Sequence, residues 1–463
     1  MVVFLDAVEK ALTGKPCSER DYDLKIFSTK LREVVKEYDI KYDPENLVSS
    51  DNSLADDIFK AAFDFYCEVG TYCKDTERII KFDENEIKDR LRNSPSRIVF
   101  GEGVDAGTMV PRKPEDRTPP WRFVGAGGVA VSSEDVFMGL VENYAKIPIA
   151  NSITTPTLTR VNGIRIRPYS PLEILGAIRT VALGREAIRR AGRPGLPIMN
   201  SIATADSAIA LVAGLHPEYG LRPTDGYMVA TLAELKTNFD LLNRACALMS
   251  LGLPTAAIFG PIFGGYCGGP EGTAVVTVAY HLMGALVYQA GWFLAFPIHI
   301  KHIASSMPEL LWVASVYAQA ISRNTHLLAL YYDYTAAGPC TKMSLYEMAA
   351  QYTAAITSGV SMETGGIAKG RREDYLTPVE PRFAAEVAYA AAGMKREDAN
   401  EIVKNLASKY VDKIADPPIG MKYQECCDTK TGKPSRKCLN IYNGVRKELK
   451  DLGLDLSRNE REY

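Results

Sequence analysis

The 463-residue sequence lacks an excess of charge of either sign. Its 54 Lys and Arg residues nearly balance 56 Asp and Glu residues, which gives a formal net charge of -2. The two signs alternate along the chain, so there is no basic patch of the kind that binds nucleic acid or an anionic membrane surface. We therefore expect neither nucleic acid nor membrane among its partners.

The sequence also lacks a secretory signal. The first residues, "MVVFLDAVEKALTGKP", contain only a short apolar run before Asp6, too short for the apolar core of a signal peptide. The nine cysteines are scattered and odd in number, which predicts reduced thiols and no disulfide framework. The one cluster, Cys426, Cys427 and Cys438, lacks the Cys-x-x-Cys spacing of zinc sites, so we predict no metal. These features favour a cytoplasmic protein.

Acidic and basic residues are absent from residues 273–300, "TAVVTVAYHLMGALVYQAGWFLAFPIHI". That length would span a bilayer. However, the segment contains His281, Gln289 and Pro297, a Gly-rich loop precedes it, and β-branched residues end it. We favour a buried helix that leads into a buried strand.

Short apolar runs separated by helix-length segments dominate the middle of the chain. Such alternation predicts parallel strands with helical crossovers, and eight of them predict a (β/α)8 TIM barrel. The runner-up, a doubly wound open sheet, lacks a Gly-x-Gly-x-x-Gly motif after the early runs. We expect a mainly helical N-terminal layer over residues 1–95, the barrel over 96–394 and a helical extension over 395–463. The predicted strands are residues 98–100, 123–125, 147–150, 196–199, 227–230, 255–259, 297–300 and 328–330.

In such barrels, functional side chains come from the carboxyl ends of strands and the loops that follow. Two segments of this kind are "FGPIFGGYCGG" (259–269) and "AAGPCT" (336–341). Glycines let a backbone approach a flat ligand closely, and they also simply permit tight turns. The strand ends are poor in acids and bases, and they identify no catalytic residue.

Several segments together resemble one family over nearly the whole chain. In order, they are "TYCKDTERIIKF", "SEDVFM", "AGRPG", "PIFGGYCGG", "AGPCT", "YQECCDTKTGKP" and "IYNGVRKELKDLGLDL". They are similar to monomethylamine:corrinoid methyltransferase. The resemblance implies a (β/α)8 barrel in a homo-oligomer, typically a hexamer. It also implies transfer of a methyl group from an amine to the Co(I) corrinoid of a separate small protein, with no cofactor bound tightly by the chain itself.

One departure from the family lies at Met199. The matching position of the family holds pyrrolysine, whose electrophilic imine carbon captures the substrate amine. A methionine thioether is soft and flexible but not electrophilic. The resemblance therefore implies a homologue without pyrrolysine chemistry.

Neighbouring positions differ as well. Met228 and Ile258 match family glutamates, Tyr332 matches a glutamine, and Asp333 and Tyr334 match two tyrosines. Together with Met199, these residues are our candidate substrate-binding set. They predict an apolar and aromatic pocket in place of a polar one.

A methylated onium ion, quaternary ammonium or sulfonium, suits such a pocket, because its leaving group departs neutral and aromatic faces hold its charge. The candidate rings are Tyr266, Tyr331, Tyr332 and Tyr334, with Asp333 for charge balance. The loops expected to face the corrinoid contain Gly264, Gly265, Tyr266, Gly268, Gly269 and Gly338. The alternative is a non-catalytic relative that binds a methylated ligand or acts as a scaffold.

Overall fold

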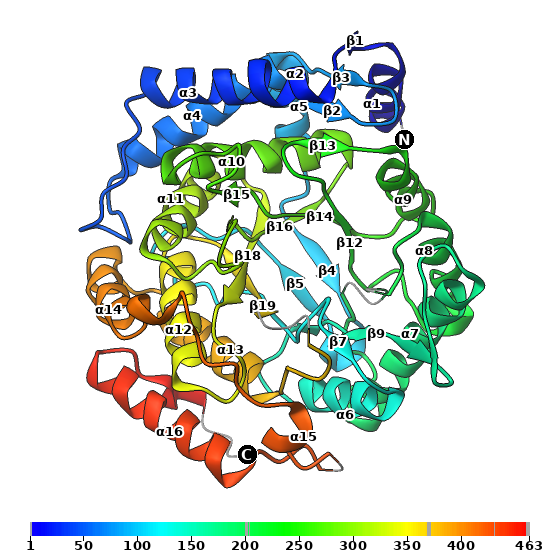
Figure 1. Ribbon diagram of the computed structural model, residues 1–463, viewed down its shortest axis with the longest axis vertical. Helices are drawn as coiled ribbons and strands as arrows, with labels where there is room; N and C mark the ends of the chain where they lie inside the picture. The colour runs from blue at the N-terminus through cyan, green and yellow to red at the C-terminus, as the bar shows by residue number, and fades with distance from the viewer. Residues whose placement is uncertain (1, 200–201, 203, 368–371, 430, 460–463) are drawn as a thin grey trace.

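The centre of the fold is a parallel sheet that curls into a ring with helices outside it (Figure 1). The computed structural model describes residues 2–199, 202, 204–367, 372–429 and 431–459. The strand order is β12-β14-β16-β18-β19-β6-β8, and all neighbours are parallel. The bounds are β6 (Arg122–Val124), β8 (Ser152–Ile153), β12 (Tyr227–Ala230), β14 (Thr255–Phe259), β16 (Trp292–Ala295), β18 (Leu328–Thr335) and β19 (Ser361–Ile367).

Two single bridges close the ring between β8 and β12. Ile153 bridges Ile198, and Met199 bridges Gly226, both in parallel orientation. The segment around Met199 thus takes the remaining strand position. Because the eight strand positions follow one another in chain order around the ring, the predicted (β/α)8 barrel is confirmed.

A helix follows each of the eight strand positions in the described part of the chain. The helices form the outer ring that parallel strands require, because their crossovers must cover the sheet. They are α6 (Glu134–Ala145), α7 (Pro171–Arg190), α8 (Ala208–Gly214), α9 (Phe239–Ser250), α10 (Pro270–Val287), α11 (Pro308–Asn324), α12 (Lys342–Thr357) and α13 (Val379–Ala391).

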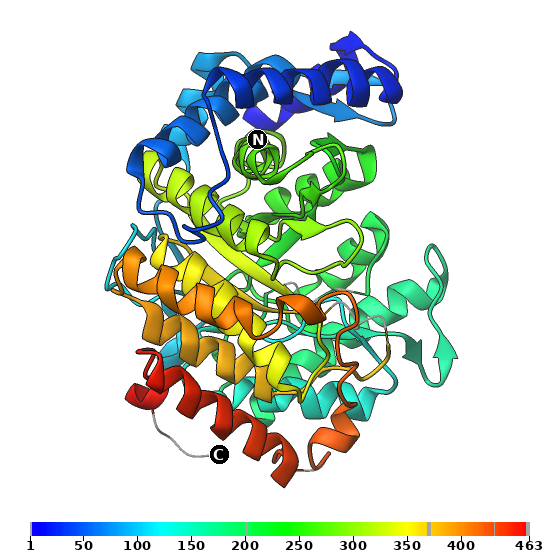
Figure 2. The same ribbon diagram turned by 60° about the vertical axis from the view of Figure 1, so that its left-hand side comes forward.

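The segment without charged residues forms α10 and β16. Every residue of α10 from Gly272 to Val287 is buried, because the barrel covers one side and the N-terminal layer covers the other (Figures 1 and 2). Among the described residues, no helix combines the length and hydropathy needed to cross a bilayer. The expected buried helix leading into a strand is confirmed.

The N-terminal layer lies across one side of the barrel (Figure 2). It contains strands as well as helices, and β2 pairs in parallel with β13 (Lys236–Thr237), which anchors the layer to the loop after β12. Its elements are α1 (Val2–Thr13), β1 (Lys15–Pro16), α2 (Glu19–Asp21), η1 (Tyr22–Phe27), α3 (Ser28–Glu37), α4 (Asn52–Val69), β2 (Thr71–Cys73), β3 (Arg78–Ile80) and α5 (Glu84–Asn93).

The strand prediction was wrong at both ends of the barrel. Residues 98–100 form β4 (Ile98–Phe100), which pairs antiparallel with β5 (Gly107–Met109) outside the barrel sheet. Phe100 and Met109 from this hairpin pack against the barrel interior at Trp292 and Trp121. The last barrel strand, β19, was missed because its acid and paired glycines interrupt the apolar pattern.

Two further strands lie a few residues from their predicted places. The run at 147–150 precedes β8, and the run at 297–300 follows β16. The latter contains β17 (Ile298–His299), which pairs with β15 (Ile262–Phe263) above the barrel. Both runs lie next to the ends of barrel strands, and their short local pattern does not distinguish them from strands. The remaining short elements are η2 (Gly103–Asp105), β7 (Ala130–Val131), β9 (Thr157–Leu158), β10 (Arg160–Val161), β11 (Ile164–Arg165) and η3 (Pro217–Tyr219).

The C-terminal extension packs on the barrel helices α12 and α13. It consists of α14 (Arg396–Ser408), η4 (Val411–Lys413), α15 (Tyr423–Cys426), α16 (Arg436–Asp451) and η5 (Leu456–Asn459). A disulfide joins Cys340, just before α12, to Cys438 in α16. This corrects the expectation that all cysteines are reduced: the two lie 98 residues apart in sequence, and only the packing of α16 brings them together.

Candidate active site

A cavity of about 400 Å³ opens at the carboxyl ends of the barrel strands, where the fold places functional side chains. Its floor and wall come from β12, β14, β18, β19 and the residue after β16. The lining residues are Gly127, Gly128, Ile202, Ala205, Asp206, Leu211, Tyr227, Met228, Ala230, Leu241, Arg244, Ile258, Phe296, Tyr332, Tyr334 and Glu363. We call this space the mouth cavity.

Four of the six candidate substrate-binding residues line the mouth cavity: Met228, Ile258, Tyr332 and Tyr334. The side chains of Met228 and Ile258 form part of the apolar floor of the cavity and pack against the core inside the barrel. The structure therefore brings together residues that are more than 100 positions apart in sequence.

Met199 does not line the cavity. Its side chain is fully buried in the core inside the barrel, against Gly226 and Trp292, where a Cβ on Gly226 would collide with the thioether chain. A side chain without a strong polar group is buried there at little cost. The expectation that Met199 contacts substrate is corrected: in this structure it packs beneath the site.

Three aromatic rings form one wall of the cavity. The ring centroids of Tyr332 and Tyr334 are 5.3 Å apart, and that of Phe296 lies 5.7 and 5.6 Å from them. The alternation of β18 explains the pair, because residues two apart on a strand point to the same face. The Tyr332 hydroxyl donates to the Gly127 carbonyl at 3.2 Å, which fixes its ring.

The other two candidate rings, Tyr331 and Tyr266, do not belong to this wall. Tyr331 points away from the barrel interior, and its buried hydroxyl donates to Gln351 Oε1 at 2.8 Å. Tyr266 lies on the glycine-rich loop and is 45% exposed. Phe296, which replaces them in the wall, was missed because the strand before it was predicted a few residues late.

Asp333 lies on the outer face of β18, between the two tyrosines that face inward, and it does not line the cavity. Its Oδ1 accepts hydrogen bonds from the Tyr352 hydroxyl at 2.5 Å and from the Gly365 backbone N–H at 3.0 Å. Burial raises the pKa of this carboxyl to about 6. We expected Asp333 to balance a cation's charge inside the pocket; strand alternation instead turns its carboxyl away from the mouth cavity.

The acid that does line the cavity is Glu363 on β19. It pairs in register with Tyr332 on one side and Phe123 on the other, so the three side chains share the inner face. Glu363 is 1% exposed, and its Oε2 has no hydrogen-bond partner among the described residues. Burial, and secondly the nearby Asp333, raise the pKa of Glu363 well above its ordinary value. A buried acid in a cavity with a pKa this strongly perturbed is a candidate functional group.

The outer rim of the cavity is polar. Asp206 is exposed there, and its pKa is raised by partial burial and by Glu173. The guanidinium of Arg244 donates to Asp240 Oδ2 at 2.8 Å and to the Ala205 carbonyl at 3.1 Å. The charged rim surrounds an apolar and aromatic interior with one buried carboxyl.

The glycine-rich loop lies outside the mouth cavity. Its residues Gly265 to Gly269 line a separate groove of about 570 Å³ against α3 of the N-terminal layer. Gly264, Tyr266, Gly268 and Gly269 are exposed, and a corrinoid-facing role for the loop stays a prediction. Gly338 is different: it is buried, it donates its N–H to the Pro418 carbonyl, and a Cβ there would overlap Ile419. The C-terminal extension covers it, so Gly338 does not face a docking partner.

Comparison with known proteins gives a consistent result. The family model "Monomethylamine methyltransferase MtmB" matches residues 2–454. Monomethylamine methyltransferase MtmB1 of Methanosarcina barkeri is 34% identical over 453 residues, 97% of each chain. The corresponding MtmB1 of Methanosarcina acetivorans is 34% identical over 457 residues, again 97% of each chain.

Solved structures agree. The crystal structure of the Methanosarcina barkeri monomethylamine methyltransferase matches with a TM-score of 0.94 at 34% identity, covering 97% of this chain and 98% of that one. The hydroxylamine complex of MtmB matches with the same values. The barrel and its extensions are thus shared along the length of the chain.

Proposed function

Because this chain belongs to the monomethylamine methyltransferase MtmB family, a family of methyltransferase enzymes, we propose that it transfers methyl from a small methylated onium ion to a Co(I) corrinoid. The corrinoid would be carried by a partner protein, and the chain would act as a homo-oligomer, as the resemblance implies. The reaction would not use pyrrolysine. The chain itself would hold the methyl donor in the mouth cavity.

The observation that supports an onium donor is the combination of three aromatic rings with one buried carboxyl. Phe296, Tyr332 and Tyr334 present ring faces and edges, and Glu363 contributes a carboxyl oxygen without a partner among the described residues. Aromatic faces stabilise a cation by about 0.5 to 2 kcal/mol each, more when it is desolvated. Ionised Glu363 would balance the remaining charge.

The chemistry places few demands on proton-transfer groups. When methyl leaves an onium ion, the C–N or C–S bonding pair stays on nitrogen or sulfur, which departs neutral. No general acid or base is needed, so catalysis rests on orientation and on exclusion of water by the apolar floor at Met228 and Ile258. The nucleophile comes from the corrinoid.

A primary amine fits this cavity less well. Monomethylammonium has three N–H donors, and each donor left without an acceptor after burial costs about 1 to 3 kcal/mol. Glu363 offers acceptors for part of that set, while Met228, Ile258 and Phe296 offer none. Since Met199 provides no electrophile to activate the amine, we expect monomethylamine to be neither bound tightly nor demethylated.

The test is a methyl-transfer assay with the full chain, cob(I)alamin and a panel of donors: tetramethylammonium, a betaine, a trimethylsulfonium salt and monomethylamine. We expect methylcobalamin from at least one onium compound and none from monomethylamine. Rapid demethylation of monomethylamine would overturn the proposal. Onium binding without methyl transfer from any donor would favour the non-catalytic alternative, which the loss of the family's reactive residue at Met199 also favours.

A further inference from the structure

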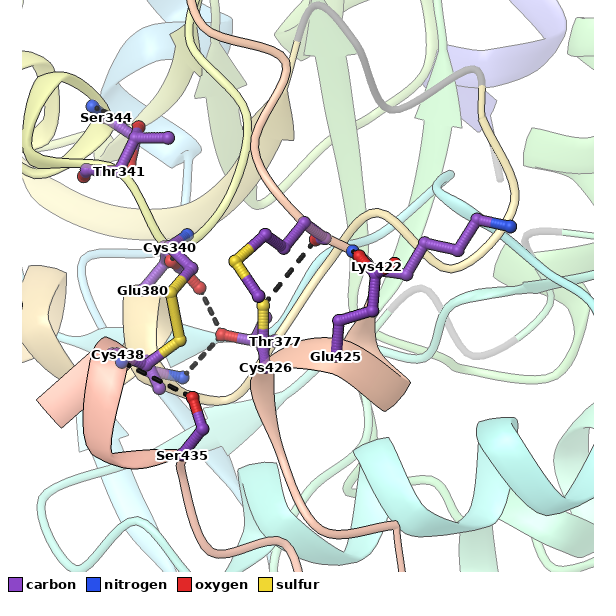
Figure 3. The surroundings of a disulfide bond; sticks show 12 residues. Cys340, Thr341, Ser344, Thr377, Glu380, Lys422, Glu425, Cys426, Ser435 and Cys438 are labelled. Atoms are coloured by element: carbon purple, nitrogen blue, oxygen red, sulfur yellow. Dashed lines mark hydrogen bonds between the residues drawn. A yellow bond between two sulfur atoms is a disulfide. The ribbon is translucent and has the colours of Figure 1, made fainter.

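Three cysteine sulfur atoms from distant parts of the chain gather at one buried place (Figure 3), and none of the three residues lines the mouth cavity. Cys340 precedes α12, Cys426 ends α15 and Cys438 lies in the first turn of α16. All three residues are buried, and their sulfur atoms lie within 4.8 Å of one another. Cys340 and Cys438 form the disulfide, and Cys426 remains a thiol beside it.

A cross-link alone needs only two of these residues. The third thiol, Cys426, donates to the Met421 carbonyl at 3.6 Å, a long and weak contact. Thiolates that share a tetrahedral zinc ion at about 2.3 Å each lie about 3.8 Å apart. Since all three sulfur atoms lie within 4.8 Å of one another and two of them are bonded, breaking that bond leaves three thiols within reach of one soft-metal ion.

The ends of two helices favour negative charge on two of the sulfur atoms. Cys340 stands directly before Thr341, the N-cap of α12, and Cys438 is the third residue of α16, where its N–H donates to the Ser435 N-cap. Both helices have 16 residues. The positive ends of their dipoles stabilise thiolates placed beside them.

An oxygen donor also lies at the cluster. Glu380 accepts a hydrogen bond from the Cys340 backbone N–H at 2.7 Å, and its other oxygen accepts one from the Thr377 hydroxyl (Figure 3). Zinc usually takes four ligands, so three thiolates leave one position for water or a carboxyl.

We propose that reduced Cys340, Cys426 and Cys438 bind a thiophilic divalent cation such as Zn²⁺, and that the disulfide is the oxidised, metal-free state of the same site. A dithiol reductant gives two electrons to the Cys340–Cys438 bond and becomes a disulfide itself. The three thiols then release three protons as they bind the ion. In reverse, a small disulfide oxidant takes two electrons from the thiolates of Cys340 and Cys438 and, with two protons from solvent, becomes two thiols. The ion leaves as the Cys426 thiolate takes up the third proton.

Either state would fasten the C-terminal extension to the barrel, because Cys340 belongs to the loop after β18 while Cys426 and Cys438 belong to the extension. The disulfide links the segments of Cys340 and Cys438, and the ion would link the segment of Cys426 as well. The site is independent of the methyl-transfer proposal.

The experiment compares the full chain in two redox states. After reduction with a dithiol and its removal without air, the protein is titrated with Zn²⁺ against a chromophoric chelator and with Co²⁺ for thiolate-to-cobalt absorption. We expect one ion per reduced chain with that absorption and no such ion in the oxidised chain. Equal binding by both states, or no binding by the reduced chain, would overturn the proposal without any variant.

Two serine variants locate the ion. Cys426→Ser keeps the disulfide but removes one proposed zinc ligand. Loss of a residue that only supports a ligand can weaken metal binding by up to roughly 100-fold. We therefore expect the reduced variant to bind Zn²⁺ at least that much more weakly. Cys427→Ser changes the adjacent buried cysteine, which lies outside the cluster, and should bind as the wild type does. Loss of binding in both variants, or in neither, would show that the cluster is not the site.

Discussion

Replacement of Glu363 by Gln tests the central feature of the mouth cavity. Gln keeps the size and shape of the side chain but cannot carry charge. Because Glu363 is 1% exposed and faces Tyr332 across the β18–β19 pair, the change removes the buried carboxyl that becomes negative when it loses its proton, while leaving the aromatic wall in place. We expect Glu363→Gln to weaken binding of tetramethylammonium strongly.

The size of the effect follows from the geometry. A cation centred about 5 Å from the carboxylate gains about 3 kcal/mol at an effective dielectric constant of about 20. Loss of that interaction corresponds to a roughly 150-fold weaker affinity. The raised pKa of Glu363 reduces the effect at low pH, because the acid must lose its proton before it can balance the cation.

The pH dependence has a definite sign. Since the pKa of Glu363 in the free protein is raised, wild-type affinity for the cation should increase as pH rises toward that pKa, with one proton released on binding. In the absence of ligand, wild-type stability should fall relative to Glu363→Gln above the ordinary pKa of glutamate, because only the unfolded state is then ionised. The Gln variant should lack both trends.

Calorimetric titration at several pH values measures affinity and proton release together. Asp206→Asn is the matched control: it removes a carboxyl from the rim of the same cavity, where exposure and salt screen the charge, and it should cost less than about 1 kcal/mol. Equal losses in the two variants, or an unchanged affinity and pH profile in Glu363→Gln, would refute the reasoning.

Three further predictions concern the ring wall and the folded state. Tyr332→Ala should weaken tetramethylammonium binding by about 1 kcal/mol, measured by the same titration, because one ring leaves the wall. Lys236→Ala should lower the free energy of unfolding in urea by about 3 to 5 kcal/mol, because it leaves the buried carboxylate of Asp23 without its ammonium partner at 2.8 Å. Gly338→Ala should lower the melting temperature and expose the C-terminal extension to protease, because the new methyl group overlaps the Ile419 carbonyl.

Each of these has a matched control. Tyr332→Phe keeps the ring and should retain the affinity. Lys25→Ala breaks an exposed ion pair with Asp21 and should cost less than about 1 kcal/mol. Gly444→Ala, in α16 where a Cβ meets nothing within 4 Å, should leave the melting temperature unchanged or raise it. A control that loses as much as its partner variant would contradict the stated cause.

The sequence by itself determined the fold class. Parallel strands buried on both faces must be apolar and must be joined by helices, so alternation of short apolar runs with helical segments predicts the barrel. The same logic predicted the buried helix in residues 273–300. It failed for residues 98–100, because an apolar hairpin that closes the end of the barrel has the same local pattern as a barrel strand.

The sequence also determined part of the site. Tyr332 and Tyr334 share a strand face because side chains alternate with period 2, and Met228 and Ile258 end strands of the same barrel. The alternation alone does not show whether the even-numbered or the odd-numbered residues of the strand face the barrel interior. It depends on the register with β19, which turns the two tyrosines in and Asp333 out.

Only the tertiary structure decided the rest. Glu363 stands beside Tyr332 because β19 pairs with β18, and a lone acid in a glycine-containing run gives no local sign of that neighbour. Cys340 meets Cys426 and Cys438 because α16 packs on α12. Local periodicity shows which face of a helix or strand is buried. Contacts between distant segments depend on how those faces pack against one another. The position of Glu363 in the cavity and the cysteine cluster therefore follow only from the folded chain.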